Sequence, residues 1–242
     1  MISFFAALQF LTIVPPVVRR DIRAAELGRS VASYPLVGLL MGVALLGASR
    51  QLASVFSPWI VAGVILMLWV LASGGIHMDG LMDAADGIFG GKTTEQRLNI
   101  MRDERVGAFG VLAAILLMLL KFVALAEGLS DFPALVLAPV IGRWTMSLAI
   151  VTFPYARSQG LGSALKREAR PLYLVIATLI GSLICFLTAG LQALFVMGIA
   201  GLCLILLGQF VTKRVGGFTG DIYGGANELM ELLVLLFFSL NL

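Results

Sequence analysis

The most informative stretch of this 242-residue sequence contains three aspartates at helical spacing, which are candidates for catalysis or metal binding. If their segment is helical, Asp79, Asp83 and Asp86 lie on one face within an arc of about 60°. Carboxylates this close repel one another unless cations neutralise them, and Mg²⁺ prefers such oxygen ligands together with substrate phosphates. The spacing therefore predicts a magnesium site for a displacement at phosphorus. The alternative is a solvated acidic helix face, although such faces usually interleave lysine with glutamate and carry no glycines.

Two glycines and a histidine accompany these aspartates. Gly80 and Gly87 each directly follow an aspartate, and because they lack a Cβ atom we expect a bulky diphosphate to approach the helix there. His77 is the only histidine, and it falls nearly opposite the aspartates if the helix extends back to it. Two interpretations of His77 stay open: a general base for a substrate hydroxyl, or a structural hydrogen-bonding side chain.

Basic residues follow the aspartates between positions 92 and 105. Thr93 and Gln96 have the spacing of a capping box, which predicts a short helix along the membrane interface. The arginines that follow could bind a diphosphate bidentately. They could equally hold anionic lipid head groups, or only obey the charge rule of membrane topology. These arginines are Arg97, Arg102 and Arg105.

Two further segments add polar residues near glycines. The loop 155–162 contains Arg157 and glycines that would allow close contact with a ligand. The segment 216–225 contains Asp221 and leads into the last apolar helix.

That last helix carries Asn227, Glu228 and Glu231. An acid in the centre of a membrane span costs about 2.5 to 3.5 kcal/mol, so each glutamate should face a partner, an ion or a watery cavity. We expect Glu228 to face the cavity, together with Asn227. Buried pairing with Arg143 or Lys121 is the alternative for either glutamate.

The composition shows what kind of element must position these residues. Apolar residues make up 60% of the chain and charged residues 13%, against about 45–50% and 25% in soluble domains. A mean hydropathy of +1.00 is too high for a core of this size to bury in water. The sequence predicts an all-α, polytopic helical integral membrane protein, organised as one transferase domain over residues 1–242.

Six apolar segments approach the length of about 20 residues that a membrane span needs. The segments 2–18 and 222–242 are marginal, the first because it is short and the second because it carries glutamates. The prediction is therefore six secure spans and up to eight. The secure segments are 31–49, 55–72, 107–126, 132–153, 171–189 and 192–211.

The basic residues are distributed unequally between the loops. Four lie in each of the loops 19–30, 73–106 and 154–170, two lie in 212–221, and the opposite face has Arg50 alone. By the positive-inside rule the basic face is cytoplasmic. The sequence thus predicts a multi-pass protein of the cytoplasmic (inner) membrane whose active site faces the cytoplasm.

Taken together, the motifs resemble the cobalamin synthase family, whose members are adenosylcobinamide-GDP ribazoletransferases. The resemblance covers almost the whole chain, and the aspartate core is its specific part. It implies that Mg²⁺ assists transfer of the cobinamide phosphate from adenosylcobinamide-GDP to the ribose hydroxyl of α-ribazole or its 5′-phosphate, with release of GMP. The matching stretches are the Phe-Leu-Thr-Ile-Val-Pro opening at Phe10, 77–87, 101–110, 155–162, and 219–221 through 228–231.

The resemblance also implies roles and partners. The three aspartates would hold Mg²⁺, and one of them or His77 would deprotonate the ribose hydroxyl. Partners are the two substrates and the lipid bilayer, with no nucleic acid; homo-oligomers or association with other enzymes of the cobalamin pathway stay open. Arg102, Arg105 and Arg157 would bind phosphates, and Asp221, Asn227 and Glu228 would complete the cavity.

Two other classes of protein share some of these features. The piece Asp83-x-x-Asp86-Gly87 resembles CDP-alcohol phosphotransferases, but those continue into an Ala-Arg pair where this chain has Gly90-Gly91. A transporter would explain the spans and the glutamates of the last helix. It would not explain why acids and arginines gather on one face.

Overall fold

The computed structural model describes residues 2–128 and 132–240, and 81% of these residues are helical. Within this described part the only β-type pairing is an isolated bridge between Tyr155 and Phe218. The predicted all-α class is therefore confirmed. The helices are α1 (Ile2–Leu11), α2 (Ala24–Ser30), the 3₁₀ turn η1 (Val31–Ser33), α3 (Tyr34–Ala53), α4 (Pro58–Ala72), α5 (Ile76–Gly90), α6 (Thr94–Ile100), α7 (Ala108–Gly128), α8 (Phe132–Thr152), α9 (Leu161–Glu168), α10 (Pro171–Val215) and α11 (Gly220–Phe238).

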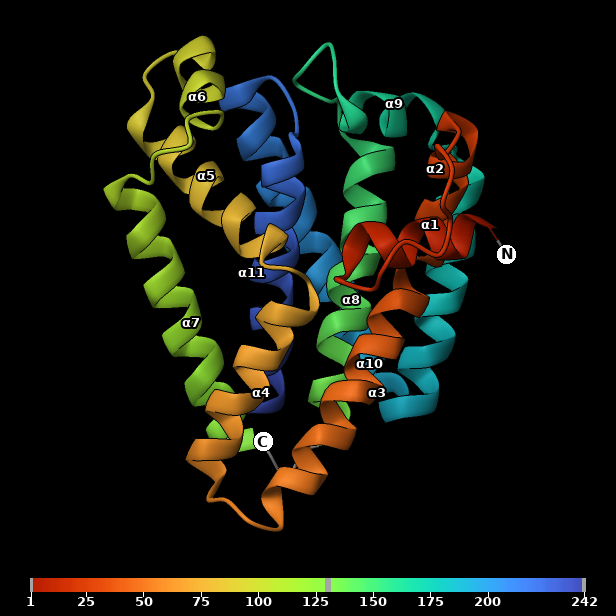
Figure 1. Ribbon diagram of the computed structural model, residues 1–242, viewed down its shortest axis with the longest axis vertical. Coiled ribbons are helices and arrows are strands. Elements are labelled where there is room, and N and C mark those ends of the chain that lie inside the picture. Colours follow the sequence, from red (N-terminus) through yellow and green to blue (C-terminus); the bar gives the residue numbers. More distant parts are fainter. Residues whose placement is uncertain (1, 129–131, 241–242) are drawn as a thin grey trace.

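Helix α8 forms the centre of the bundle. It packs against α3, α10 and α11, and 89% of its apolar window is buried inside the protein. The corresponding share for α7 is 28%, so α7 presents most of its apolar surface outward. Figure 1 shows α7 at the edge of the bundle. Peripheral helices of this composition need lipid as their solvent.

The predicted number of spans is not confirmed. Four helical stretches of the described chain are long and apolar enough to cross a membrane, or five if the bent pair α4–α5 counts as one span. Helix α1 has only ten residues, and α11 carries three acids within its nineteen. Neither is a candidate span, and the last two residues of the predicted segment 222–242 lie outside the described residues. The four stretches are 24–53, 108–128, 133–152 and 171–215.

Helix α10 contains a break that divides it into two halves. Its backbone leaves the helical region at Ala189 and Gly190, and Gly190 has a φ of +61°. Ser182 Oγ lies 3.8 Å from Met197 Sδ, whereas a straight helix would separate these residues by about 22 Å. The halves therefore run antiparallel, coloured cyan and blue in Figure 1. They coincide with the two apolar segments predicted at 171–189 and 192–211.

A second break in the backbone sets the direction of α5, the helix that carries the three aspartates. Gly74 and Gly75 adopt left-handed φ values of +66° and +73°, which only glycine adopts at little cost. Helix α5 consequently leaves α4 at 85°. In Figure 1 it climbs toward the end of the molecule where α2, α6 and α9 lie, opposite the α3–α4 connection. The breaks and short helices thus gather the polar loops at one end.

Candidate active site

A cavity of about 500 Å³ opens at this polar end. Helices α5 and α11, the loop after α8 and the end of α1 supply its walls. Five of the predicted site residues line it: His77, Asp79, Arg102, Arg157 and Asp221.

Arg157 and Asp221 form the ion pair in the cavity wall. Arg157 Nη2 donates to Asp221 Oδ2 at 2.9 Å and to the Met101 carbonyl at 3.3 Å. Thr219 also donates to Asp221 Oδ2 at 3.2 Å and caps α11 by accepting from the Ile222 amide. Burial raises the pKa of Asp221, while the Arg157 guanidinium and the Thr219 hydroxyl oppose that rise. The pair therefore holds the loop after α8 against the start of α11.

Aromatic rings that sequence reasoning did not assign to the site also line the cavity. Tyr155 stacks on Tyr223 with ring centroids 6.2 Å apart. The Ala156 amide donates to the Phe218 carbonyl at 2.8 Å, which joins the two glycine-containing segments. Burial raises the pKa of Tyr155. The aromatic residues flank motifs already visible in the sequence, but no local pattern indicates that they stack on each other.

Asp79 and Asp83 keep the arrangement that the sequence predicts. Asp79 is exposed on the cavity wall, and the half-buried Asp83 is within electrostatic range of Asp79, Asp86 and Asp221. Among the described residues, no group of three His, Cys, Asp or Glu side chains already forms a metal site. The donors nonetheless fit Mg²⁺, because this ion usually takes one or two carboxylates and completes its shell with water and substrate phosphates.

Asp86 has a different environment from the other two aspartates. Its Oδ2 accepts from the Gly107 amide at 2.7 Å, and its Oδ1 accepts from the Gly110 amide at 2.8 Å. These amides lie at the start of α7, where helix N–H groups lack intrahelical partners and the helix dipole favours negative charge. Asp86 therefore anchors α5 to α7. Sequence reasoning missed this role because the partners lie 21 and 24 residues further along the chain.

The prediction that Gly80 and Gly87 admit a diphosphate is wrong. A methyl group at Gly80 would lie 2.7 Å from the Asp221 carbonyl oxygen, and one at Gly87 would lie 2.5 Å from Met101 Cγ. The space beside both glycines is filled by the protein itself, which lets α5 approach α11 and the residue after α6 closely. In the loop 155–162, Gly162 likewise makes room for the Tyr155 ring.

The arginines around α6 separate into different positions. The predicted capping box of Thr93 and Gln96 is confirmed at the start of α6. Arg102 lines the cavity, whereas Arg97 donates to the carbonyls of Ile88 and Arg214.

Arg105 lies apart from the cavity. It is largely exposed and pairs with Asp103 at 2.8 Å, which lowers the pKa of Asp103 to about 2. Asp103, Arg105 and the backbone around Gly107 border a separate small hollow. The structure therefore does not bring Arg105 to the other predicted phosphate ligands.

The glutamates of α11 lie in a buried ion network beneath the cavity. Lys121 Nζ donates to Glu228 Oε2 and to Glu231 Oε2, each at 2.6 Å, and Arg143 pairs with Glu231 Oε1. All four side chains are buried. The structure thus places Glu228 against Lys121, as the buried-pairing alternative expects, and not among the residues that line the cavity.

His77 connects the network to the cavity. Its Nδ1 lies 3.2 Å from Asn227 Nδ2 and 3.5 Å from Arg143 Nη2, and Asn227 Nδ2 also donates to Glu231 Oε1. Because an arginine only donates and the glutamate fixes the amide orientation, Nδ1 faces two donors and must accept. The ring proton of neutral His77 is then on Nε2, which is buried and has no partner among the described residues.

Fold and cavity together define a class: an α-helical membrane protein with an acidic, arginine-bearing cavity at one end. The sequence model of the Cobalamin-5-phosphate synthase family matches residues 3–239, and the chain belongs to that family. The resemblance noted in the motifs is therefore confirmed.

Individual relatives agree with the family match. The chain is 41% identical over 236 residues to the adenosylcobinamide-GDP ribazoletransferase of Desulforamulus reducens, covering 96% of this chain and 94% of the relative. It is also 41% identical over 242 residues to the protein of that name from Pseudomonas savastanoi, covering 98% of each. The Brevibacillus brevis protein of that name is 38% identical, covering 98% of this chain and 97% of the relative. No solved structure gives a significant match.

Proposed function

We propose that this protein is an adenosylcobinamide-GDP ribazoletransferase, joining adenosylcobinamide-GDP to α-ribazole or α-ribazole 5′-phosphate in late cobalamin biosynthesis. The observation that carries the proposal is full-length similarity to proteins of that name, with identities of 38–41% among those compared above. The cavity supports it, because carboxylates and arginines side by side are the groups that phosphoryl transfer requires.

The reaction is a displacement at phosphorus. The ribose hydroxyl oxygen of the acceptor forms a bond to the phosphorus that carries the cobinamide, and the bond from that phosphorus to the GMP oxygen breaks. GMP leaves with the bridging oxygen, and the hydroxyl proton goes to a base. Such reactions depend mainly on positioning and on stabilisation of phosphate charge.

We assign these tasks to the residues of the cavity. Arg157 and Arg102 supply guanidinium groups for the diphosphate, and Arg157 is already oriented by Asp221. Asp79 is the carboxylate best exposed to take the hydroxyl proton. His77 would donate a hydrogen bond through Nε2 instead of acting as the base, because its Nδ1 accepts from Asn227 and Arg143.

We assign Asp79 and Asp83, with Asp221 nearby, to hold Mg²⁺. When bound there, the ion would neutralise phosphate charge and orient the reacting oxygens. We leave Asp86, the third ligand in the sequence prediction, out of the magnesium site, because each of its oxygens already accepts a backbone N–H at the start of α7.

The test of this function is GMP release by the purified protein from adenosylcobinamide-GDP and α-ribazole. We expect turnover to stop with a chelator and to return with Mg²⁺ or Mn²⁺, because both are octahedral ions that prefer oxygen ligands. Omitting α-ribazole is the control for simple hydrolysis. Failure to release GMP with either acceptor, in protein shown to be folded, would contradict the assignment.

We further propose that the protein lies in the cytoplasmic membrane with the cavity facing the cytoplasm, because the basic loops gather at the cavity end. Thr94→Cys and Ser163→Cys place thiols at that end, on α6 and α9. In intact cells both should resist a membrane-impermeant thiol reagent, and in inverted vesicles both should react. Ser54→Cys, at the end of α3, should react in intact cells. The reverse pattern would invert the proposed orientation.

A further inference from the structure

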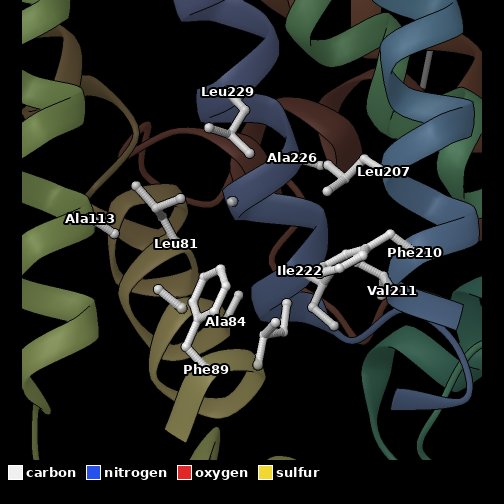
Figure 2. A pocket seen from close by; sticks show the side chains of 13 residues that line it. Leu81, Ala84, Phe89, Ala113, Leu207, Phe210, Val211, Ile222, Ala226 and Leu229 are labelled. Carbon is white, nitrogen blue, oxygen red and sulfur yellow. The ribbon is translucent and has the colours of Figure 1, made fainter. Parts of the chain in front are cut away.

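An apolar groove of about 260 Å³ lies between α5, α7, α10 and α11 (Figure 2). Every residue that lines it is Ala, Gly, Leu, Ile, Val or Phe. On α5 the lining residues include Leu81 and Ala84, which fall on the side of the helix opposite Asp79 and Asp83. The groove and the cavity thus use opposite faces of the same helix.

The position of the groove along the candidate spans indicates what surrounds it. Ala113 lies near the start of α7, and Leu207 and Val211 lie near the end of α10. Both helices are candidate spans, and both positions are close to the polar end of the bundle. Phe89, Phe210 and Leu229 expose 59%, 39% and 38% of their surface along this groove. At this depth the solvent that meets such a surface is a lipid acyl chain, not water.

Two basic residues, Lys213 and Arg214, come just after the groove residues of α10, at the polar end of the bundle. The Arg214 guanidinium lies 4.6 Å from the centroid of the Phe210 ring, one helical turn beyond that groove residue. Lys213, the preceding residue in α10, is exposed, and Arg97 donates to the Arg214 carbonyl at 3.0 Å. Helix α6 contributes a single acid, Glu95. This end therefore carries an excess of positive charge at the level where lipid head groups lie.

We propose that the groove binds one acyl chain of an anionic phospholipid, whose phosphate contacts Lys213 and Arg214. The apolar lining accounts for the chain, and the two cations account for the preference for a negative head group. By filling the space between α5 and α11, the lipid supports the helix that carries Asp79 and Asp83 on its other face. The proposal does not depend on the transferase assignment.

The experiment measures lipids retained by the protein after purification and exchange into phosphatidylglycerol or phosphatidylcholine, using native mass spectrometry and thermal melting. Wild type should retain phosphatidylglycerol and melt at a higher temperature with it than with phosphatidylcholine. Lys213→Gln with Arg214→Gln should weaken phosphatidylglycerol binding about thirtyfold, the usual effect of two basic side chains near an anionic surface. Ala113→Phe should fill the groove and abolish the preferential retention of phosphatidylglycerol.

Matched variants separate this site from the general lipid surface. Leu179→Phe enlarges an exposed apolar position on the other half of α10, and Arg167→Gln with Arg170→Gln removes two exposed cations near α9. Neither should change the preference for phosphatidylglycerol. Equal retention of both lipids by wild type, or an equal loss in the control variants, would overturn the proposal. So would a change confined to oligomeric state, which would assign the groove to a second copy of the chain.

Should Ala113→Phe fail to fold, the charge variant alone decides the question. Its side chains are exposed at the end of α10, and it leaves every apolar residue that lines the groove unchanged. Unchanged phosphatidylglycerol affinity in that variant would refute the head-group contact on which the proposal depends.

Discussion

The cavity and the buried ion network both combine acids with bases, but they differ in how completely the charges are compensated. In the network, Lys121 and Arg143 face Glu228 and Glu231, and the pairs are buried. Charges removed from water in this way must be matched by partners of opposite sign. The network is therefore complete without a ligand.

The cavity lacks such a balance. Asp221 has Arg157 as its partner, whereas Asp79 and Asp83 form no ion pair within the part of the chain that the structure describes. Clustered carboxylates near solvent favour a cation and its phosphate ligands more than another side chain. In this protein the uncompensated carboxylates therefore lie where we propose chemistry, and the matched charges hold helices together. His77 and Asn227 lie between the two groups.

The largest expected effect comes from breaking the network at its most connected acid. Glu231→Gln leaves Arg143 without its carboxylate and Lys121 with one partner instead of two. Removing one member of a buried ion pair typically costs 3–5 kcal/mol, so we expect this variant to lose most of its folded protein. The measurement is the yield of membrane-inserted protein and its melting temperature in detergent.

Glu228→Gln is the matched comparison, because within the described residues Glu228 forms an ion pair with Lys121 only. Its loss of stability should be smaller than that of Glu231→Gln. If Glu228→Gln instead stopped GMP release without lowering the melting temperature, Glu228 would belong to the active site, as the sequence first predicted.

The next effect concerns the cavity itself. Asp79→Asn keeps the shape of the side chain but removes a charge from the proposed magnesium site and from the proposed base. Losing one such electrostatic group typically lowers the rate by about 10² to 10³. The melting temperature should stay at the wild-type value, because Asp79 is exposed and forms no ion pair with any residue that the structure describes.

This prediction is checked by comparing GMP release at equal amounts of folded protein. Glu95→Gln, which removes an exposed acid on α6, serves as the control and should keep wild-type activity. Near-normal turnover in Asp79→Asn would show that the aspartate face is a solvated surface without a catalytic role.

The smallest of these effects distinguishes Asp86 from its neighbours. Asn at this position has one acceptor oxygen where Asp86 uses two, so the start of α7 would lose a hydrogen bond and a favourable charge. Loss of a helix cap costs about 0.5 to 2 kcal/mol. We expect Asp86→Asn to lower the melting temperature, while the rate per folded molecule falls much less than in Asp79→Asn. If that rate collapsed while the melting temperature stayed unchanged, Asp86 would be a metal ligand, as the spacing of the aspartates predicts.

Much of the site was visible in the linear sequence. The spacing of Asp79 and Asp83 was correctly placed on a helix, and the capping box at Thr93 marked the start of α6. These features depend on neighbours within one or two helical turns, which a periodic pattern can reveal. The apolar composition and the one-sided distribution of basic residues likewise indicated a helical membrane protein with its polar loops at one end.

Contacts between distant segments were decided by the tertiary structure. Glu228 and Lys121 are 107 residues apart, and Asp86 and Gly110 are 24 apart, so no local pattern distinguishes a catalytic acid from one that holds helices together. The predicted number of spans is not confirmed for a similar reason, because hydropathy measures the length of an apolar run and not its path. Residue types and their local spacing identified the candidate catalytic groups, and the apolar composition identified lipid as the solvent of the chain. Only the packing of α5, α7, α8 and α11 decided which charges meet each other and which are left for a ligand, because compensation depends on distance in space.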